Sequence, residues 1–428
     1  MTTIAAPPEV APGRHFIDGE WRESERTFPI FHPATGRELT RCAEGSVSEV
    51  DRAVRAARKA LEGAWKRTAP ATRGKLLVRL GELIEQHADE LARLTTLEMG
   101  KPLQESSTID VPHSAGVFRY YGEWANKLYG ETCPVDPAFL NYTLREPLGV
   151  VGAITPWNFP LVLASWKVAP ALCCGNTVVL KPPEQAPLAT LRLGELALEA
   201  GFPPGVLNVV AGGAETGVAL TAHTQVDKIA FTGEHRTAQA IMESARVNLK
   251  RISFECGGKS PHIVFPDADM EGALRGAFGG IFSNAGQICN AGSRLFVHRN
   301  VASDVVERLT ERARRIRLGD PIAEDTEMGP VVSLEQMKRV MELVASGRSE
   351  GARLACGGAE HELAQQGGYY VEPTVFTQVK PPMRIAREEI FGPVLSVLEF
   401  EDEDELVAMA NDSLFGLAAG VWTRDLSR

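Results

Sequence analysis

The chain lacks several features that would place it in whole classes of protein. No apolar run approaches the roughly 18 residues that a membrane-spanning helix needs, so we expect no membrane association. The first twelve residues show no basic-then-apolar signal pattern. Acidic residues outnumber basic ones by 55 to 45, for a net charge of −10. Phosphate binding needs a basic stripe, so nucleic acid is not expected as a main partner.

Metal ligands and disulfide frameworks are also missing. The nine histidines and seven cysteines have neither metal-ligand spacing nor the pattern of a disulfide scaffold. We therefore predict no metal site and a reducing, cytoplasmic compartment. Cys173 and Cys174 adjoin each other in an apolar, helix-like run, and we expect both to be small buried residues. No GxGxxG fingerprint is present, so motif alone gives only weak evidence for nucleotide binding.

What the chain does contain is enough apolar material for two or three domains, with 428 residues of which 44% are hydrophobic. Short apolar strands alternate with helices over residues 147–256, and a second such series follows Gly258. Continuous apolar strands with crossover helices are typical of parallel sheets covered on both faces. The predicted fold class is α/β, with two doubly wound, Rossmann-like domains and the active site in the cleft between them.

Two stretches carry candidate chemistry. Glu255 stands between a strand-like run and the pair Gly257-Gly258, and Cys289 lies in the small, flexible run Asn284–Arg294. A carboxylate base and a soft nucleophile serve covalent catalysis if the fold brings them together. Taken alone, Glu255 is better explained as an ion-paired strand end, and Asn158 as a loop-capping residue beside Pro160.

A third pair, Lys181 and Glu184, follows a predicted strand. Open α/β sheets bind ligands at the carboxyl ends of their strands, where this carboxylate can accept hydrogen bonds from both ribose hydroxyls. A surface ion pair explains the same two residues if nothing else is considered.

With the run Thr155-Pro156-Trp157-Asn158-Phe159-Pro160, these motifs resemble the NAD(P)-dependent aldehyde dehydrogenase family, and the resemblance runs from His15 to Trp422. It implies an aldehyde dehydrogenase-like fold. Residues 1–123 and 147–256 would form the NAD-binding domain, 124–146 an oligomerisation segment, and 257–428 a catalytic domain. Family members continue for several dozen residues past Arg428, so the catalytic domain is expected to be C-terminally incomplete.

The resemblance implies NAD-dependent oxidation of an aldehyde to a carboxylic acid. Cys289 would attack the aldehyde to give a thiohemiacetal, with the Asn158 amide and the Cys289 backbone N–H as oxyanion donors. After hydride transfer to the cofactor, Glu255 would activate water to hydrolyse the thioester. Lys167 resembles a family lysine near the active site, and we expect it to act as a proton relay.

The same resemblance implies a cofactor site and a substrate tunnel. A carboxylate at position 184 repels a 2′-phosphate, so NAD is expected in preference to NADP. Expected cofactor contacts are Ile154, Thr155, Pro156, Trp157, Lys181, Glu184, Gly213, Phe231, Thr232, Gly233, Gln336, Glu389 and Phe391. Expected tunnel residues are Leu163, Trp166, Phe282 and Ser283.

Some positions depart from the family pattern. Glu234 stands where Ser is usual, and Ala238 stands where a helix-opening Gly is common. Both are expected beside the cofactor phosphates, where an added negative charge would weaken NAD binding. Cys256 replaces a usual Leu beside the base.

Three other functions remain open on the sequence. A CoA-acylating relative would release the acyl group to a thiol, although Glu255 argues against it. A catalytically impaired, truncated family member is the second alternative. A cysteine hydrolase without cofactor is the third, but it lacks a motif-placed His near Cys289. We expect a homodimer or homotetramer, weakened if the C-terminal tail is absent; the identity of the aldehyde is not predicted.

Overall fold

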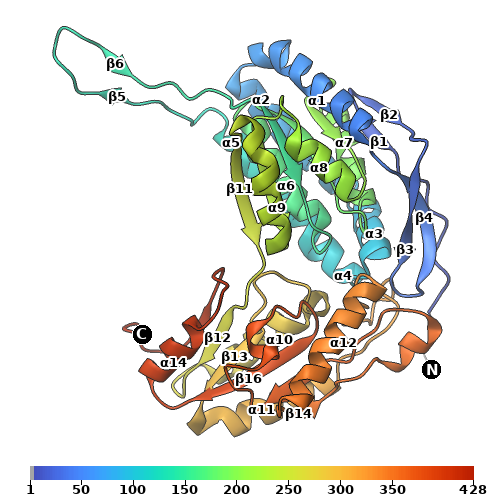
Figure 1. Cartoon of the computed structure of the whole chain (residues 1–428), viewed down its shortest axis with the longest axis vertical. Coiled ribbons are helices and arrows are strands. Elements are labelled where there is room, and N and C mark those ends of the chain that lie inside the picture. Colours follow the sequence, from blue (N-terminus) through green and yellow to red (C-terminus); the bar gives the residue numbers. More distant parts are fainter. Residues whose placement is uncertain (1–3) are drawn as a thin grey trace.

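The computed structural model describes residues 4–428, which form two α/β bodies and a projecting arm (Figure 1). In the first body, seven strands of the described chain form one sheet in the order β11-β10-β7-β8-β9-β1-β2. The five strands from β11 to β9 are parallel, whereas β1 and β2 pair antiparallel at the edge. Their bounds are β1 (His15–Ile17), β2 (Glu20–Arg22), β7 (Val150–Ile154), β8 (Thr177–Lys181), β9 (Leu207–Val209), β10 (Lys228–Gly233) and β11 (Arg251–Cys256).

Helices cover both faces of this sheet, as the continuous apolar strands predict. Every residue of β7 and β8 is buried, which requires apolar cover on both sides. One face packs against α2 (Pro70–Gln86), α3 (Ala88–Met99), α5 (Val111–Trp124), α6 (Pro160–Cys173) and α7 (Leu188–Glu199). The other packs against α1 (Val47–Glu62), α8 (Ala214–Ala222) and α9 (His235–Ala245). A capping box formed by Ser46 and Glu49 starts α1.

The second body is built on a sheet of six strands within residues 4–428, in the order β14-β15-β16-β13-β12-β17. All neighbours pair parallel except β14 with β15. The strands are β12 (Pro261–Val264), β13 (Arg294–His298), β14 (Arg353–Cys356), β15 (Thr374–Thr377), β16 (Val394–Phe400) and β17 (Gly420–Trp422). The helices are α10 (Met270–Phe282), α11 (Arg299–Arg314), α12 (Leu334–Ser349), α13 (Arg384–Arg387) and α14 (Glu403–Asn411).

Two small antiparallel pairs lie outside the main sheets. The arm carries β5 (Thr132–Cys133) and β6 (Asn141–Tyr142), and it extends away from both bodies (Figure 1). The other pair, β3 (Thr27–His32) with β4 (Arg37–Ala43), was not predicted from the sequence. The turn after β3 reaches the second body, because Ala34 packs with Leu363 and Tyr370 in one buried cluster. The N-terminal segment therefore contacts both bodies.

One sequence expectation is wrong: Cys173 is buried, but Cys174 is exposed. Cys173 is the last residue of α6, and Cys174 caps the helix, where the side chain turns away from the core. Among residues 4–428, no helix is long and apolar enough to cross a membrane. No group of three His, Cys, Asp or Glu residues in that range could hold a metal ion.

Candidate active site

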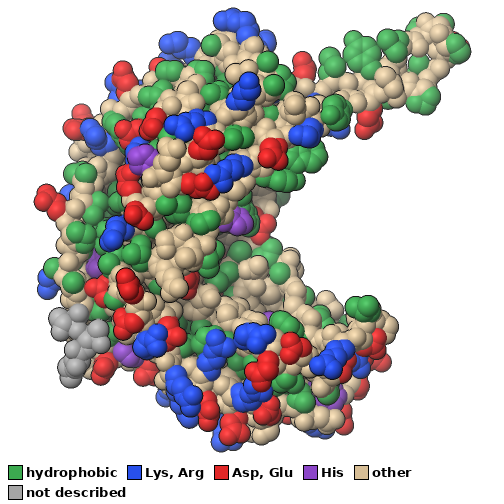
Figure 2. Space-filling view, turned by 180° about the vertical axis from the view of Figure 1, so that it is seen from behind, with side chains coloured by type: hydrophobic (Ala, Val, Ile, Leu, Met, Phe, Trp, Pro, Cys, Tyr) green, Lys and Arg blue, Asp and Glu red, His purple; other side chains and the backbone are tan. Residues whose placement is uncertain are grey.

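The candidate site lies at the connection between β11, in the first sheet, and β12, in the second sheet. Glu255 is the penultimate residue of β11, and Gly257 and Gly258 lead from it into β12. A Cβ added at Gly258 would lie 3.0 Å from the carbonyl oxygen of Cys289. The turn after Glu255 therefore touches the loop that carries the candidate nucleophile. The space-filling view shows a hollow between the two bodies (Figure 2).

Cys289 is half-buried among negative charges. Burial raises the pKa of its thiol, and the carboxylates of Glu255 and Glu389 raise it further. The thiol is therefore protonated at neutral pH in this state, so it needs a base to become a nucleophile. The charge of Glu255 acts on the thiol, and its role as that base stays a prediction.

Asn158 lies in the loop after β7, with its side chain 2% exposed. Its Nδ2 donates to the carbonyl oxygen of Gln287 at 3.0 Å. This hydrogen bond joins the first body to the residue two positions before Cys289. One amide hydrogen of Asn158 is used in it, and the second remains available.

Lys167 projects from α6 towards the end of β10, where its Nζ hydrogen-bonds the hydroxyl of Thr232. Thr232 is the parallel partner of Glu255 in the sheet register. Burial lowers the pKa of Lys167 to about 8, although the charge of Glu255 opposes the shift. An amine with that pKa exchanges protons near neutral pH.

The predicted adenosine end lies at the carboxyl end of β8. Burial lowers the pKa of Lys181 to about 8 against the opposing charge of Glu184, and its Nζ donates to the Pro182 carbonyl at 3.1 Å. A Cβ at Gly213 would lie 2.8 Å from Oε2 of Glu184, so the backbone of Gly213 lies close beside this carboxylate. A cavity of about 560 Å³ opens here, lined by Glu184, Gly213, residues 28–31 and residues 332–335. It marks the predicted adenosine end rather than the nucleophile.

The predicted nicotinamide end is built by the loop before β16. Burial raises the pKa of Glu389 to about 7, and the carboxylate accepts a hydrogen bond from the Gly258 N–H at 3.1 Å. The Phe391 ring meets the edge of Trp157 at 5.2 Å between centroids. Gln336 donates to the Phe391 carbonyl at 2.7 Å. In this state Gln336 therefore supports the loop, and its direct contact with a cofactor stays a prediction.

The other predicted cofactor residues end strands of the first sheet. Ile154 ends β7 and Thr155, Pro156 and Trp157 follow it, while Phe231, Thr232 and Gly233 end β10. The Phe231 ring is buried and packs edge-on against Phe254 at 6.0 Å. These segments are adjacent because β10 and β7 pair in parallel.

The predicted tunnel residues divide into two environments. Leu163 is buried on α6, and Trp166 is exposed, with its Nε1 donating to His113 at 2.9 Å. Phe282 ends α10 and is buried in the core of the second body, with Ser283 directly after it. Among residues 4–428, no hydrogen bond or ring contact joins the two groups, so a shared tunnel stays a prediction.

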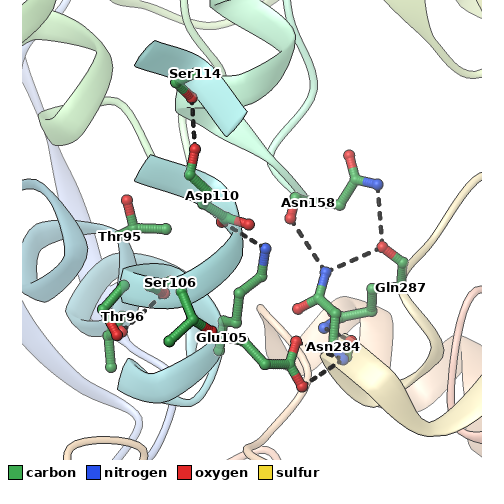
Figure 3. Close-up of polar contacts among 12 residues, drawn as sticks. Thr95, Thr96, Glu105, Ser106, Asp110, Ser114, Asn158, Asn284 and Gln287 are labelled. Carbon is green, nitrogen blue, oxygen red and sulfur yellow. Dashed lines mark hydrogen bonds and ion pairs between the residues drawn. The ribbon is translucent and has the colours of Figure 1, made fainter. Parts of the chain in front are cut away.

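Three residues that sequence reasoning missed hold this site together. Asn284 and Gln287 belong to the same run as Cys289, and they hydrogen-bond Asn158 and each other (Figure 3). Glu105, from α4 (Leu103–Glu105), accepts from the Asn284 backbone N–H. Asn284 and Gln287 could have been noticed as polar residues beside Gly286 in the run that contains Cys289. Nothing in the sequence around Glu105 indicated a role in the site.

Comparison with known proteins identifies the family. The aldehyde dehydrogenase family model matches residues 21–428. Retinal dehydrogenase 2 of Homo sapiens is 46% identical over 419 residues, which cover 96% of this chain and 80% of the relative. The putative aldehyde dehydrogenase DhaS of Bacillus subtilis is 46% identical over 417 residues, covering 96% of this chain and 84% of the relative.

Solved structures agree with the sequence relatives. The NAD+ complex of an aldehyde dehydrogenase from Bacillus cereus superposes with a TM-score of 0.95 at 45% identity, covering 97% of this chain and 85% of that one. An indole-3-acetaldehyde dehydrogenase in complex with NAD+ gives the same TM-score, identity and coverage. The chain therefore belongs to the aldehyde dehydrogenase family.

Proposed function

We propose that this member of the family oxidises an aldehyde to a carboxylic acid with NAD, through an acyl group held covalently on Cys289. The relatives are aldehyde dehydrogenases over nearly the whole chain, and two solved neighbours carry NAD+. The observation that carries the assignment of residues is the 3.0 Å hydrogen bond from Asn158 Nδ2 to Gln287 O. It ties an amide donor of the first body to the loop of the nucleophile.

The residues present fit a dinucleotide. Gly213 leaves room beside Glu184 that a Cβ would fill, and the adjoining cavity is open between the two bodies. Lys181 and Glu184 would hold the adenosine ribose, and Glu389 with Phe391 would hold the nicotinamide end. When bound, NAD supplies the hydride acceptor. We therefore propose residues 1–123 and 147–256 as the NAD-binding domain and residues 257–428 as the catalytic domain, with Glu389 and Phe391 of the catalytic domain reaching the nicotinamide end.

The chemical steps then use side chains of this chain. Glu255 removes the proton of the Cys289 thiol, and the thiolate attacks the aldehyde carbon to form a thiohemiacetal. Asn158 and the backbone N–H of Cys289 donate to the oxyanion, each contributing on the order of 10²–10³-fold to the rate. Loss of hydride leaves a thioester on Cys289. The proton taken from the thiol first leaves Glu255 through Lys167 and Thr232, so the carboxylate is ionised again when it deprotonates the attacking water. Collapse of the resulting tetrahedral adduct releases the carboxylic acid and returns the Cys289 thiolate.

Replacement of the nucleophile tests the proposal. Cys289→Ala is expected to abolish NADH formation with a panel of aldehydes that includes acetaldehyde, retinal and indole-3-acetaldehyde. Cys174→Ala is the matched control, because Cys174 is exposed at the end of α6 and should retain wild-type turnover. Retained turnover in Cys289→Ala would overturn the assignment.

Product analysis separates hydrolysis from CoA acylation. With Glu255 in place, the free acid is expected without CoA, at a rate that added CoA leaves unchanged. Acyl-CoA as the sole product would favour the acylating alternative. A wild-type chain that forms no NADH with any aldehyde would favour an impaired family member.

We further propose a homo-oligomer in a reducing compartment such as the cytoplasm. All seven cysteines are free, and all lie within the described residues. The arm exposes a row of apolar side chains, among them Phe139, Leu140, Tyr142 and Leu144. Exposed apolar surface on a projecting arm favours burial against another subunit.

A further inference from the structure

The loop before the nucleophile has an unusual backbone. Asn284, Ala285 and Gly286 have φ angles of 49°, 50° and 73°, so three successive residues occupy the left-handed region. Ala285 has no polar side chain to compensate for this conformation, which L-residues rarely adopt. Such a backbone persists only when surrounding contacts hold it. The contacts that hold this loop are therefore informative.

The loop is fixed from both bodies. The two carboxylate oxygens of Glu105 accept from the Asn284 backbone N–H at 3.1 and 3.3 Å. Gln287, which is fully buried, donates through Nε2 to the Asn284 carbonyl at 2.9 Å and accepts the Val332 N–H at 2.9 Å. A Cβ at Gly286 would lie 2.1 Å from the Gly392 carbonyl oxygen, so glycine is needed there. The loop is thus locked in one conformation.

Asn284 itself connects the loop to Asn158 (Figure 3). Its Nδ2 donates to the Asn158 carbonyl oxygen at 3.1 Å and to the Gln287 carbonyl oxygen at 3.1 Å. The Gln287 carbonyl also accepts the Asn158 side chain at 3.0 Å. A flipped Asn284 amide would face two carbonyl oxygens with its own oxygen, so only the observed orientation is compatible with these partners. Asn158 is therefore held at its carbonyl and at its side chain.

The opposite side of Asn158 is held as well. Its neighbour Phe159 carries the Lys101 ammonium 3.6 Å from the ring centroid. Lys101 is buried and pairs with Asp110 at 2.6 Å. The backbone around Asn158 is thus clamped between a buried ion pair and Asn284.

We propose that Asn284 is a positioning residue that aims the free N–H of Asn158 at the oxyanion formed on Cys289, with Glu105 anchoring Asn284 from the first body. The inference rests on the proposed roles of Asn158 and Cys289. An oxyanion donor acts only within about 2.7–3.1 Å of the developing charge. Misplacement by about 1 Å costs on the order of 10²-fold in rate. Asn284 fixes two of the atoms that determine where the Asn158 amide lies.

A double-mutant cycle tests this inference. Asn284→Gly keeps the left-handed backbone accessible but removes the amide, and it is combined with Asn158→Ala. The first readout is the pre-steady-state burst of NADH, which reports acylation. The second readout is the rate at which iodoacetamide alkylates Cys289. This rate measures the reactivity of the thiol in a reaction that forms no oxyanion. The NAD dissociation constant and the melting temperature are measured in parallel.

We expect Asn284→Gly to slow the burst by about 10²-fold in the wild-type background and by less than about 3-fold in Asn158→Ala, because the two residues act through one amide. Alkylation and NAD binding should change little. An equal slowing in both backgrounds, or an unchanged burst, would overturn the inference. If Asn158→Ala alone leaves the burst unchanged, the proposed oxyanion role of Asn158 fails. That result differs from the results that would overturn only the role of Asn284.

Further variants control for backbone and folding effects. Gln378→Gly removes another non-glycine residue with positive φ, at the carboxyl end of β15 and so at the end of the sheet remote from Cys289. It should leave the burst unchanged.

Asn284→Asp tolerates the same backbone but cannot donate, and it replaces Asn284→Gly if that variant does not fold. Glu105→Ala should slow the burst and Glu105→Gln, which keeps one acceptor, should recover most of it; a Glu105→Ala burst at the wild-type rate would remove Glu105 from the inference.

Discussion

The side chain of Glu255 influences three other groups of the site. Its charge raises the pKa of the Cys289 thiol and of the Cys256 thiol, and it opposes the lowered pKa of Lys167. In each case burial of the group is the larger effect, and the charge of Glu255 adds to it or opposes it. We therefore propose Glu255 as the base both for the thiol and for the water that later attacks the acyl group.

Glu255→Gln tests which of these two steps depends on the carboxylate. The amide keeps the shape of the side chain but cannot take a proton, so steady-state turnover is expected to fall by about 10²–10⁴-fold. A residual burst of at most one NADH per site would place the defect in deacylation. Stopped-flow absorbance measures the burst, and Glu271→Gln, an exposed partner of Arg308, serves as control. An unchanged steady-state rate would exclude Glu255 as the base.

Glu389 and Lys181 predict how NAD affinity depends on pH. Burial raises the pKa of Glu389 to about 7, and burial lowers that of Lys181 to about 8. The ionised carboxylate accepts ribose hydroxyls, so affinity should rise with pH through 7. The ammonium donates to them, so affinity should fall again above pH 8.

Fluorescence titration of NAD from pH 6 to 9 tests this profile. Between pH 6 and 8, ionisation of Glu389 is expected to tighten binding by about 10-fold. Glu389→Gln should bind NAD more weakly and lose this acidic limb while keeping the alkaline one. An acidic limb that persists in Glu389→Gln would contradict the assignment.

The sequence suggested Cys289 and Glu255 as candidates through the resemblance of their motifs to the family, and their catalytic roles stay a prediction. It could not identify Glu105, whose contact with Asn284 joins positions 179 residues apart. That contact exists only once the first body has folded against the nucleophile loop. The exposure of Cys174 was missed for a similar reason, since an apolar run does not reveal where the helix turns its last residue outward.

Among the secondary elements, the buried strands were the most predictable. The strand at residues 150–154 is a continuous apolar run within the predicted series over residues 147–256, and such a run leaves little choice of structure. The pair β3–β4 was missed. Pro29 lies inside β3, and the register shifts between Ile30 and Phe31, so the strand pattern is interrupted.

Glu234, which stands where Ser is usual in the family, lies at the N-terminus of α9. Glu234 is the N-cap residue, but its side chain makes no capping hydrogen bond. Its charge instead raises the pKa of Glu389, so it projects a negative charge into the predicted cofactor site. A helix N-terminus favours an anion such as a cofactor phosphate, and a carboxylate there competes with it.

Glu234→Ser is expected to tighten NAD binding by about 2–5-fold, the range given by one charge at a helix end. Serine is also a preferred N-cap, so the melting temperature should not fall. Isothermal calorimetry measures the affinity, and Glu243→Ser, at the exposed far end of α9, makes the same charge change away from the site. Equal effects of the two substitutions would point to net charge rather than to the helix terminus.

At the level of the whole molecule, the two bodies meet through the site itself. Glu105 of the first body binds the nucleophile loop, and Glu389 of the second binds the turn after β11. The two-body α/β arrangement followed from the strand and helix patterns, whereas these contacts across the bodies did not. They depend on pairs of residues far apart in sequence, which no local pattern encodes.

The arm provides the last prediction. Phe139 and Leu140 are 73% and 80% exposed, and the arm extends away from both bodies (Figure 1). A two-stranded ribbon of this size is marginally stable alone, so it needs a surface to pack on.

We expect the wild-type chain to form a homo-oligomer, and the double substitution F139D/L140D to shift it to monomers in size-exclusion chromatography with light scattering. Val407→Asp, on the exposed face of α14, adds an aspartate outside the arm and should leave the assembly intact. A monomeric wild-type chain, or an oligomer unaffected by the arm substitutions, would show that another surface or none holds the subunits together.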